Sequence, residues 1–480
     1  MRNSQQRFYV DIMQAKTEVT GSFTLCIVKI RDKTIKFAVD CGLYQEKEYE
    51  GQNAILPTNP SELEFVLLTH NHTDHNGRLP YLVKNGFRGN IYTTNVTSRI
   101  LGHALNDSAR IIRDTCKRNN DFILFDDIDV ANTLKLIHDC EYNKPYAINE
   151  NITVTFLPNG HIIGAASILV QIHCTGEYKD INLLFSGDYS NRNLFYRVAP
   201  VRKWITMLPI NIIIESTYGN MNSNEIHEVF VKNILNALNA KKTIIVPVFS
   251  LGRAQEILYY LKTMQIKNPE MFDDVPIYYD GKLSFYYTEM YKKLLEEGLL
   301  TFYKSKREFL PENLIKVEDK VMRREIISSN NLQSKIILTT SGMASYGPAQ
   351  TYIPAYIGRD DVLIQFTGYC SENTLGYRLK NTNKNDIVEV GGIKVIKKAD
   401  VEFTNEFSAH AKSDELIKYI NKFKKPLFVM VNHGENSVKD IFADIILKET
   451  DVSKVGILGR EFFYRIDPNG LVKSLSTHFL

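Results

Sequence analysis

The amino-acid sequence predicts a layered α/β protein. Short apolar runs rich in valine, isoleucine and phenylalanine alternate along most of the chain with longer segments of helical periodicity, and this alternation is typical of sheets covered by helices. The chain has 480 residues, of which 44% are hydrophobic, so it is long enough for two or three domains with sizeable cores. An all-α or all-β architecture is therefore not expected.

Five strand-like runs each end in an ionisable residue. The runs are 35–40, 65–70, 181–188, 212–215 and 427–433, and their last residues are Asp40, His70, Asp188, Glu215 and His433. In α/β sheets the loops that leave the carboxyl ends of strands carry the chemistry. Any one of these residues alone could be an ordinary turn residue, but together they are candidates to converge on one site.

A second α/β unit is predicted inside the chain. Its strand-like runs are 243–248, 336–340 and 362–366. We expect this unit to span residues 209–395, with a first segment, residues 1–208, before it and a returning segment, residues 396–480, after it. No proline-rich linker or low-complexity tract marks these boundaries.

The amino-acid composition does not identify the protein's ligand, but it bears on cysteine chemistry and on membrane association. A formal net charge of +3 permits a polyanionic ligand but does not predict one. The six cysteines include no C-x-x-C pair, so we expect reduced thiols and neither a disulfide framework nor a cysteine-bound zinc ion. The N-terminus has no apolar signal-peptide core, and no apolar run approaches the ~18 residues of a membrane span. We therefore expect a soluble, cytoplasmic protein that does not engage membranes.

The strongest chemical signal is the segment His70-Asn-His72-Thr-Asp74-His75, which follows an apolar run. In an extended segment residues i and i+2 point the same way, so His70 and His72 can hold one metal ion. The turn that follows can direct Asp74 and His75 toward a second ion. A solvated polar loop is the alternative, but it leaves unexplained why three of the chain's eleven histidines gather here.

Further potential ligands follow later in the chain: His161, Asp188 and His433. A lone histidine at a strand end is more often a hydrogen-bonded structural residue than a metal ligand. The metal-binding role is favoured here only because the other potential ligands are present as well. If His433 joins ligands that lie before residue 190, the chain must return after the second unit. The first domain is then discontinuous.

These motifs resemble those of a known family. Asp40, the His70–His75 segment, His161 and Asp188 are similar to motifs 1 to 4 of the metallo-β-lactamase superfamily. Three later segments resemble motifs A, B and C of its β-CASP group: 215–219 (ESTYG), 407–410 (FSAH) and 432–435 (NHGE). The group includes the pre-mRNA 3′-end-processing endonuclease and its bacterial and archaeal relatives. The resemblance implies a metallo-β-lactamase αββα sandwich with an inserted Rossmann-like β-CASP domain.

The resemblance also implies roles for the ligands. His70, His72 and His161 would bind one zinc ion, whereas Asp74, His75 and His433 would bind the other. Asp188 would bridge the two ions, and Asp40 would orient the ligands or the bridging hydroxide. Two such ions can share a hydroxide that attacks a phosphodiester in line. Histidine and carboxylate ligands fit zinc best, but manganese or iron would accept the same set.

His410 is the candidate general acid, with Glu215 hydrogen-bonded to it so that the tautomer is fixed and the pKa is raised. A structural Glu–His pair in the core is the alternative. The family's RNA-cutting members carry histidine at motif B, so His410 points to RNA by resemblance. Three residues near turns are weaker candidates for phosphate contacts, because such residues are more often caps and surface charges: Ser408, Ser341 and Arg253.

The expected protein is thus a two-zinc ribonuclease of RNA processing or decay. We expect the RNA to be single-stranded and its cleavage to be endonucleolytic. The sequence leaves open whether the enzyme also acts as a 5′-to-3′ exonuclease and whether it forms a homodimer. One alternative is a metallo-hydrolase of a small substrate, which competition by RNA oligomers would distinguish. Another is a non-catalytic scaffold of an RNA-processing complex. The complete ligand set argues against the scaffold, because buried ionisable groups are costly without metal.

Overall fold

The structure is a computed structural model that describes residues 8–14, 19–45, 47–119, 122–223, 228–300, 308–328, 334–368, 370–372, 374–404, 406–407, 409–459, 462–470 and 472–476. The chain divides into two compact units. The first comprises Met1–Asn193, Val198–Asn224 and His410–Leu480, and the second comprises Leu194–Arg197 and Glu225–Ala409. The first unit is therefore discontinuous in sequence. Within the described ranges, no helix combines the length and the apolar character that crossing a membrane requires.

The first unit contains two sheets. The strands of one sheet are β1 (Phe8–Gln14), β2 (Thr24–Ile30), β3 (Lys33–Val39), β4 (Phe65–Leu67), β5 (Asn90–Thr94), β6 (Ile137–Cys140), β22 (Phe462–Ile466) and β23 (Val472–Ser476), in the order β23-β22-β1-β2-β3-β4-β5-β6. The strands of the other are β7 (Pro145–Asn149), β8 (Ile152–Pro158), β9 (Ala166–Ile172), β10 (Ile181–Phe185), β11 (Pro209–Ile214), β20 (Lys425–Val431) and β21 (Val455–Ile457), in the order β21-β20-β11-β10-β9-β8-β7.

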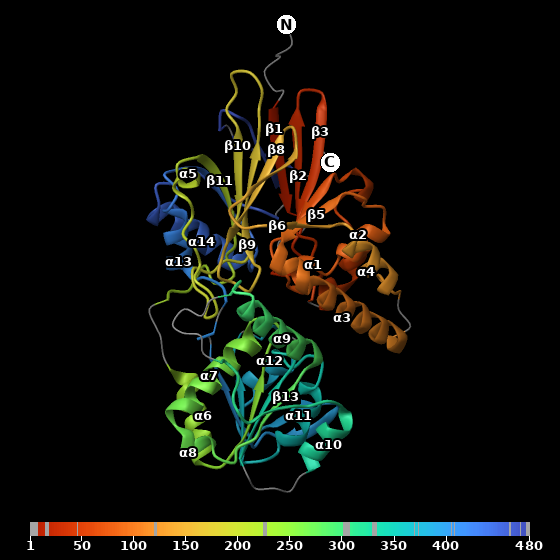
Figure 1. Ribbon diagram of the computed structural model, residues 1–480, viewed down its shortest axis with the longest axis vertical. Helices are drawn as coiled ribbons and strands as arrows, with labels where there is room; N and C mark the ends of the chain where they lie inside the picture. The colour runs from red at the N-terminus through yellow and green to blue at the C-terminus, as the bar shows by residue number, and fades with distance from the viewer. Residues whose placement is uncertain are drawn as a thin grey trace. The chain divides into compact units, whose positions relative to one another are not determined.

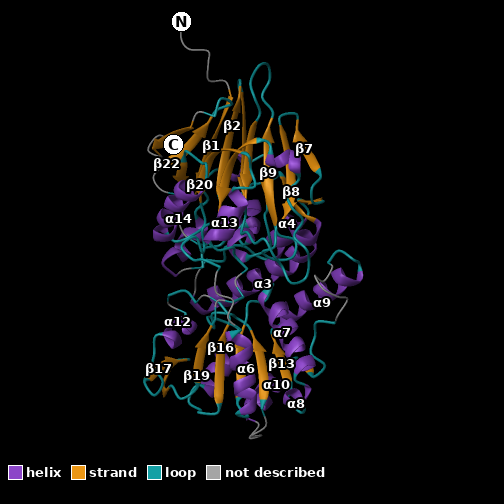
Figure 2. Ribbon diagram, turned by 90° about the vertical axis from the view of Figure 1, so that its left-hand side faces the viewer, coloured by secondary structure: helices purple, strands orange, loops and turns teal. Residues whose placement is uncertain are grey.

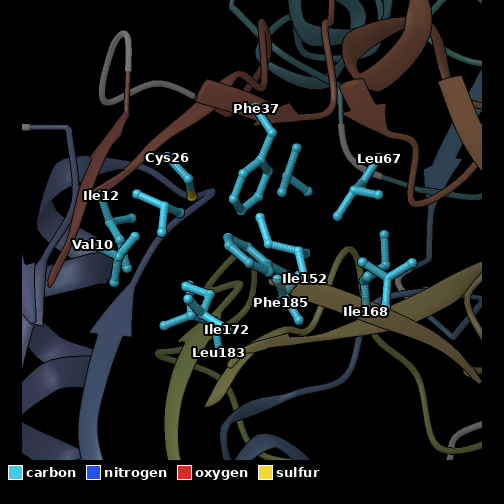
Figure 3. Packing of buried hydrophobic residues seen from close by; sticks show 14 of the residues in the cluster. Val10, Ile12, Cys26, Phe37, Leu67, Ile152, Ile168, Ile172, Leu183 and Phe185 are labelled. Carbon is cyan, nitrogen blue, oxygen red and sulfur yellow. The ribbon is translucent and has the colours of Figure 1, made fainter. Parts of the chain in front are cut away.

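The two sheets pack face to face through a buried apolar layer. Residues that alternate along each strand point into this layer, because successive side chains of a strand face opposite sides. Figure 3 shows the packing of Ile12, Phe37 and Leu67 from one sheet against Ile168 and Phe185 from the other. This shared core holds the two sheets together.

Helices cover the outer faces of both sheets (Figures 1 and 2). Over the first sheet lie α2 (Leu79–Lys84), α3 (Asn95–Asn119) and α4 (Asp127–Leu134). The same part of the chain also forms α1 (Thr73–Asn76) and the 3-10 helices η1 (Lys47–Ala54) and η2 (Pro60–Glu62). Over the second lie α5 (Lys203–Thr206), α13 (Ser413–Ile420) and α14 (Asn436–Glu449). The predicted αββα sandwich is thus confirmed.

The second unit is built on a parallel sheet. Its strands are β12 (Thr243–Pro247), β13 (Ile277–Asp280), β14 (Leu314–Lys316), β15 (Lys335–Thr339), β16 (Val362–Phe366) and β19 (Asp400–Phe403), in the order β14-β13-β15-β12-β16-β19. The hairpin β17 (Ile387–Val390) and β18 (Ile393–Ile396) is separate. The helices are α6 (Val229–Asn239), α7 (Arg253–Lys267), α8 (Pro269–Phe272), α9 (Lys282–Glu296), α10 (Lys320–Ser328), α11 (Ala349–Tyr356) and α12 (Leu375–Lys380). The predicted inserted α/β domain is present.

The unit boundaries differ from the expected residues 209 and 395. β11, which begins at Pro209, lies between β10 and β20 in the second sheet of the first unit. β19, which begins at Asp400, pairs with β16 of the second unit. Both expected boundaries are therefore too early in the chain. An apolar run predicts a strand, but it does not indicate which sheet that strand joins.

Leu183 tests how much the layer between the sheets stabilises the first unit. Its side chain is fully buried on β10 (Figure 3), so Leu183→Ala is expected to cost roughly 2 to 5 kcal/mol in free energy of unfolding. Ile128 on α4 is 70% exposed, and Ile128→Ala should change that value by less than about 0.5 kcal/mol. Urea denaturation followed by circular dichroism would measure both. An equal decrease in the free energy of unfolding of the two variants would contradict the expectation that the buried layer stabilises the first unit.

Candidate active site

Five of the predicted site residues follow the carboxyl ends of strands in the first unit. β3 leads into Asp40, β4 into His70, β10 into Asp188, β11 into Glu215, and β20 into His433. β3 runs parallel to β4, and β10 and β20 both run parallel to β11. Parallel strands end at the same edge of a sheet, which is why residues far apart in sequence meet here.

Backbone contacts set the position of the His70–His75 segment. The amide of Ser22 donates to the carbonyl of Asp74 at 2.9 Å, and the amide of Cys41 donates to the carbonyl of His75 at 2.7 Å. Gly42 passes so close that an added Cβ would lie 1.5 Å from the Asp74 carbonyl oxygen. Only glycine permits this approach. The loop after β3 therefore holds α1, which carries Asp74 and His75.

The first group of ligand atoms comes from His70, His72, His161 and Asp188, and these atoms all lie within 4.8 Å of one another. Nε2 of His70 and Nε2 of His161 are 3.5 and 3.4 Å from Oδ2 of Asp188. Nδ1 of His72 is 3.0 Å from Nε2 of His161. The structure thus brings together the residues assigned by resemblance to one ion.

The second group comprises Asp74, His75, His433 and again Asp188, also within 4.8 Å. Nε2 of His75 and Nε2 of His433 are 3.2 and 3.5 Å from the other oxygen, Oδ1, of Asp188. Oδ2 of Asp74 is 3.6 Å from both of these nitrogens. Each oxygen of the Asp188 carboxylate therefore faces a different group.

The donor set fits metal ions. Nε2 of His70 and Oδ1 of Asp188 are buried and have no hydrogen-bond partner, although such groups are normally satisfied. Burial lowers the pKa of His70 well below its usual range, so its ring is neutral and has a lone pair to donate. Burial disfavours a charged His75, but the carboxylates of Asp188, Asp40 and Asp74 outweigh burial and raise its pKa. The same negative field attracts a metal cation.

Asp40 forms hydrogen bonds with a ligand histidine and with the backbone beside another. Its Oδ2 accepts a hydrogen bond from Nδ1 of His75 at 2.7 Å, and its Oδ1 accepts one from the backbone amide of Thr69 at 2.8 Å. Asp40 has a φ of +63°, in the left-handed region that non-glycine residues seldom adopt. Such backbone conformations cluster at functional sites. The position of Asp40 suits the ligand-orienting role that the resemblance implies.

Sequence reasoning missed two threonines of the site. Nδ1 of His70 is 3.0 Å from the hydroxyl of Thr69, and Nδ1 of His433 is 3.1 Å from that of Thr217. A metal-binding histidine usually donates its second ring N–H to a partner, and that rule could have singled out Thr69 beside His70. It could not have found Thr217, which lies in the motif after β11.

His410 and Glu215 form a hydrogen-bonded pair beside the ligands. Nδ1 of His410 is 2.8 Å from Oε2 of Glu215, and its Nε2 is 3.8 Å from Oδ2 of Asp188. Oε1 of Glu215 accepts from the amide of Tyr189. Burial lowers the pKa of His410, but Glu215 and Asp188 outweigh burial and raise it to about 9. His410 therefore carries a proton at neutral pH.

Two of the three weaker candidates, Ser341 and Arg253, belong to the second unit. The hydroxyl of Ser341 accepts hydrogen bonds from the amides of Ser345 and Tyr346 at 3.1 and 3.4 Å, as a turn cap does. Arg253 is buried, and its guanidinium donates to the carbonyls of Thr367 and Phe407. These bonds hold Arg253 against loops of the fold, and its phosphate contact stays a prediction. Ser408 lies outside the described residues.

Three family models match three successive segments of the chain. The model of the metallo-beta-lactamase superfamily matches residues 28–134, and the model of the Beta-Casp domain matches residues 254–379. The model of the Zn-dependent metallo-hydrolase RNA specificity domain matches residues 394–455. The third match begins near the end of the second unit and extends past His433.

Several characterised proteins resemble the chain along most of its length. Ribonuclease TTHA0252 of Thermus thermophilus is 29% identical over 428 residues, which cover 88% of this chain and 92% of that protein. Transcription termination factor FttA of Methanococcus maripaludis is 30% identical over 424 residues, 84% of this chain and 64% of that protein. Endoribonuclease ysh1 of Emericella nidulans is 26% identical over 447 residues, 85% of this chain and 49% of that protein. The chain belongs to the β-CASP group of the metallo-β-lactamase superfamily.

Proposed function

We propose that this protein is a ribonuclease that hydrolyses RNA phosphodiester bonds with two zinc ions. The observation that carries the proposal is the position of Asp188, whose two oxygens face two separate groups of ligands while protonated His410 lies 3.8 Å from one of them. Paired ligand groups that share a carboxylate are suited to two-metal hydrolysis. A protonated histidine beside them is suited to proton donation.

Zinc is the proposed resident metal. Imidazole nitrogens and carboxylate oxygens are ligands that zinc prefers, and the first group offers three histidines and one carboxylate. Manganese would accept the same donors. The second group has two histidines and two carboxylates, so it offers more oxygen ligands than the first group. Because zinc prefers softer ligands, we expect the second group to exchange its metal ion more readily than the first.

Two divalent ions bound here would supply a nucleophilic water at neutral pH and offset charge on the phosphoryl oxygens. The chain's own residues do the rest. Nδ1–H of His410 donates to Glu215, so Nε2 carries the proton that the leaving oxygen needs. The Glu215 carboxylate also stabilises the imidazolium before the proton is transferred. The His410 side chain is 19% exposed, so part of it is accessible to a substrate.

RNA is the proposed substrate. The match to an RNA specificity domain over residues 394–455 supports it, as do relatives named ribonuclease and endoribonuclease. We propose single-stranded RNA, cut mainly endonucleolytically with a 5′-to-3′ exonuclease capacity, in RNA processing or decay. All six cysteines are free thiols, which supports a reducing compartment such as the cytoplasm.

Metal content tests the two-ion assignment. After reconstitution with zinc, wild type is expected to hold about two ions per chain, and His433→Ala should hold fewer because the second group loses a ligand. His173 pairs with Asp180 at 2.8 Å, apart from both ligand groups, so His173→Ala serves as the matched control and should keep wild-type content. Elemental analysis by mass spectrometry measures all three. A folded wild type that retains no zinc would refute the assignment.

Cleavage of an end-labelled single-stranded RNA, beside the DNA of the same sequence, tests the activity. Asp74→Ala should abolish cutting. His410→Ala should slow it roughly 10²- to 10⁴-fold through loss of the general acid, with zinc content unchanged because His410 is outside both ligand groups. Fragment lengths separate endonuclease from exonuclease action. Zinc-loaded wild type that leaves RNA intact would favour a small-substrate hydrolase instead.

A further inference from the structure

The hydroxyl of Thr69 lies between the two ligand groups. Its oxygen is 3.0 Å from Nδ1 of His70, which belongs to the first group. It is also 3.0 and 2.9 Å from Oδ1 and Oδ2 of Asp40. Asp40 in turn accepts from Nδ1 of His75, which belongs to the second group. A continuous chain of hydrogen bonds therefore runs from His70 through Thr69 and Asp40 to His75.

The chemistry of these atoms sets the direction of each bond. A carboxylate only accepts, and a threonine hydroxyl has one proton to donate. The hydroxyl proton must point to Asp40, because two oxygens at 2.9 Å without a proton between them would repel each other. The hydroxyl is then an acceptor toward His70, whose Nδ1 carries the hydrogen. When metal ions are bound, Nε2 of His70 and Nε2 of His75 would both be lone-pair donors on the side that faces Asp188.

The surroundings leave Thr69 little freedom to move. Its side chain is buried, its amide donates to Asp40 at 2.8 Å, and its carbonyl accepts from the amide of Ala166 at 3.0 Å. A Cβ added to Gly187, the residue before Asp188, would lie 3.0 Å from the Cβ of Thr69. Thr69 thus packs against the turn that directs Asp188, and it does so with carbon atoms rather than the hydroxyl.

We propose that Thr69 is a positioning residue that couples the two ligand groups: its hydroxyl holds the His70 ring directly and holds, through Asp40, the ring of His75. The inference rests on the proposed two-ion site. Loss of this one hydroxyl weakens binding of both ions, since His70 loses its acceptor and Asp40 loses a donor that fixes its carboxylate. Partners of this kind typically contribute 10- to 100-fold to metal affinity.

Thr217 provides an internal comparison. Its hydroxyl is 3.1 Å from Nδ1 of His433, and His433 belongs to the second group alone. Loss of the Thr217 hydroxyl is therefore expected to weaken one ion only. Thr69 and Thr217 make the same kind of contact with a ligand histidine. We therefore expect Thr69 to affect the binding of both ions and Thr217 to affect the binding of one.

The test is a zinc titration of the full-length protein against a competing chelator, which yields two dissociation constants. Thr69→Val keeps the shape of the side chain and removes the hydroxyl, and it should raise both constants, the larger change being about 10- to 100-fold. Thr69→Ser keeps the hydroxyl and should restore wild-type values. Thr217→Val should raise one constant. Thr93 is buried and donates to the carbonyl of Leu68 at 3.0 Å, so Thr93→Val controls for loss of a buried hydroxyl.

Each outcome bears on the proposal. Unchanged constants in Thr69→Val, a change confined to one constant, or an equal change in Thr93→Val would overturn it. If Thr69→Val does not fold, Thr69→Ala removes the same hydroxyl and must raise both constants. Because the readout is metal binding, it is independent of RNA cleavage. A wild type that binds fewer than two ions would count against the proposed function itself, whereas two ions with no Thr69 effect would count against this inference alone.

Discussion

The buried carboxylate of Asp188 is the constraint on which the rest of the site depends. A carboxylate away from water is costly unless positive charge or hydrogen-bond donors compensate it. Burial raises the pKa of Asp188, but the surrounding histidines, His433 and His75 foremost, outweigh burial and hold it well below its usual range. The group therefore stays charged between two sets of ligands. Gly187, with a φ of +58°, forms the turn that directs it there.

This arrangement explains why the first unit must be completed by the end of the chain. β20 lies between β11 and β21 and leads into His433, while His410 precedes α13 on the outer face of the same sheet (Figure 1). Neither the second ligand group nor the His410–Glu215 pair is complete without this returning segment. The inserted unit has its own parallel sheet and core, so it interrupts the first unit in sequence without being part of its sheets.

Much of this could be predicted from the sequence, because the information is local. The strand-like run that ends at His70 and the spacing of the ligands after it are visible in eleven consecutive residues, 65–75, and the family motifs supply the distant ligands. The unit boundaries could not be predicted, since β11 and β19 differ in pairing partner rather than in apolar pattern. Thr217 was missed because a threonine hydroxyl carries no distinctive spacing, whereas Thr69 could have been singled out as the neighbour of His70. The contacts of Arg253 could not be predicted either, because its carbonyl partners lie more than a hundred residues away.

Anomalous diffraction can show whether Asp188 joins two metal sites. Crystals of the zinc-loaded protein, measured on either side of the zinc absorption edge, are predicted to give two anomalous peaks roughly 3.5 to 4 Å apart, with the Asp188 carboxylate between them. One peak would lie against His70, His72 and His161 and the other against Asp74, His75 and His433. A single peak at full zinc loading, or two peaks of which neither contacts Asp188, would contradict the account.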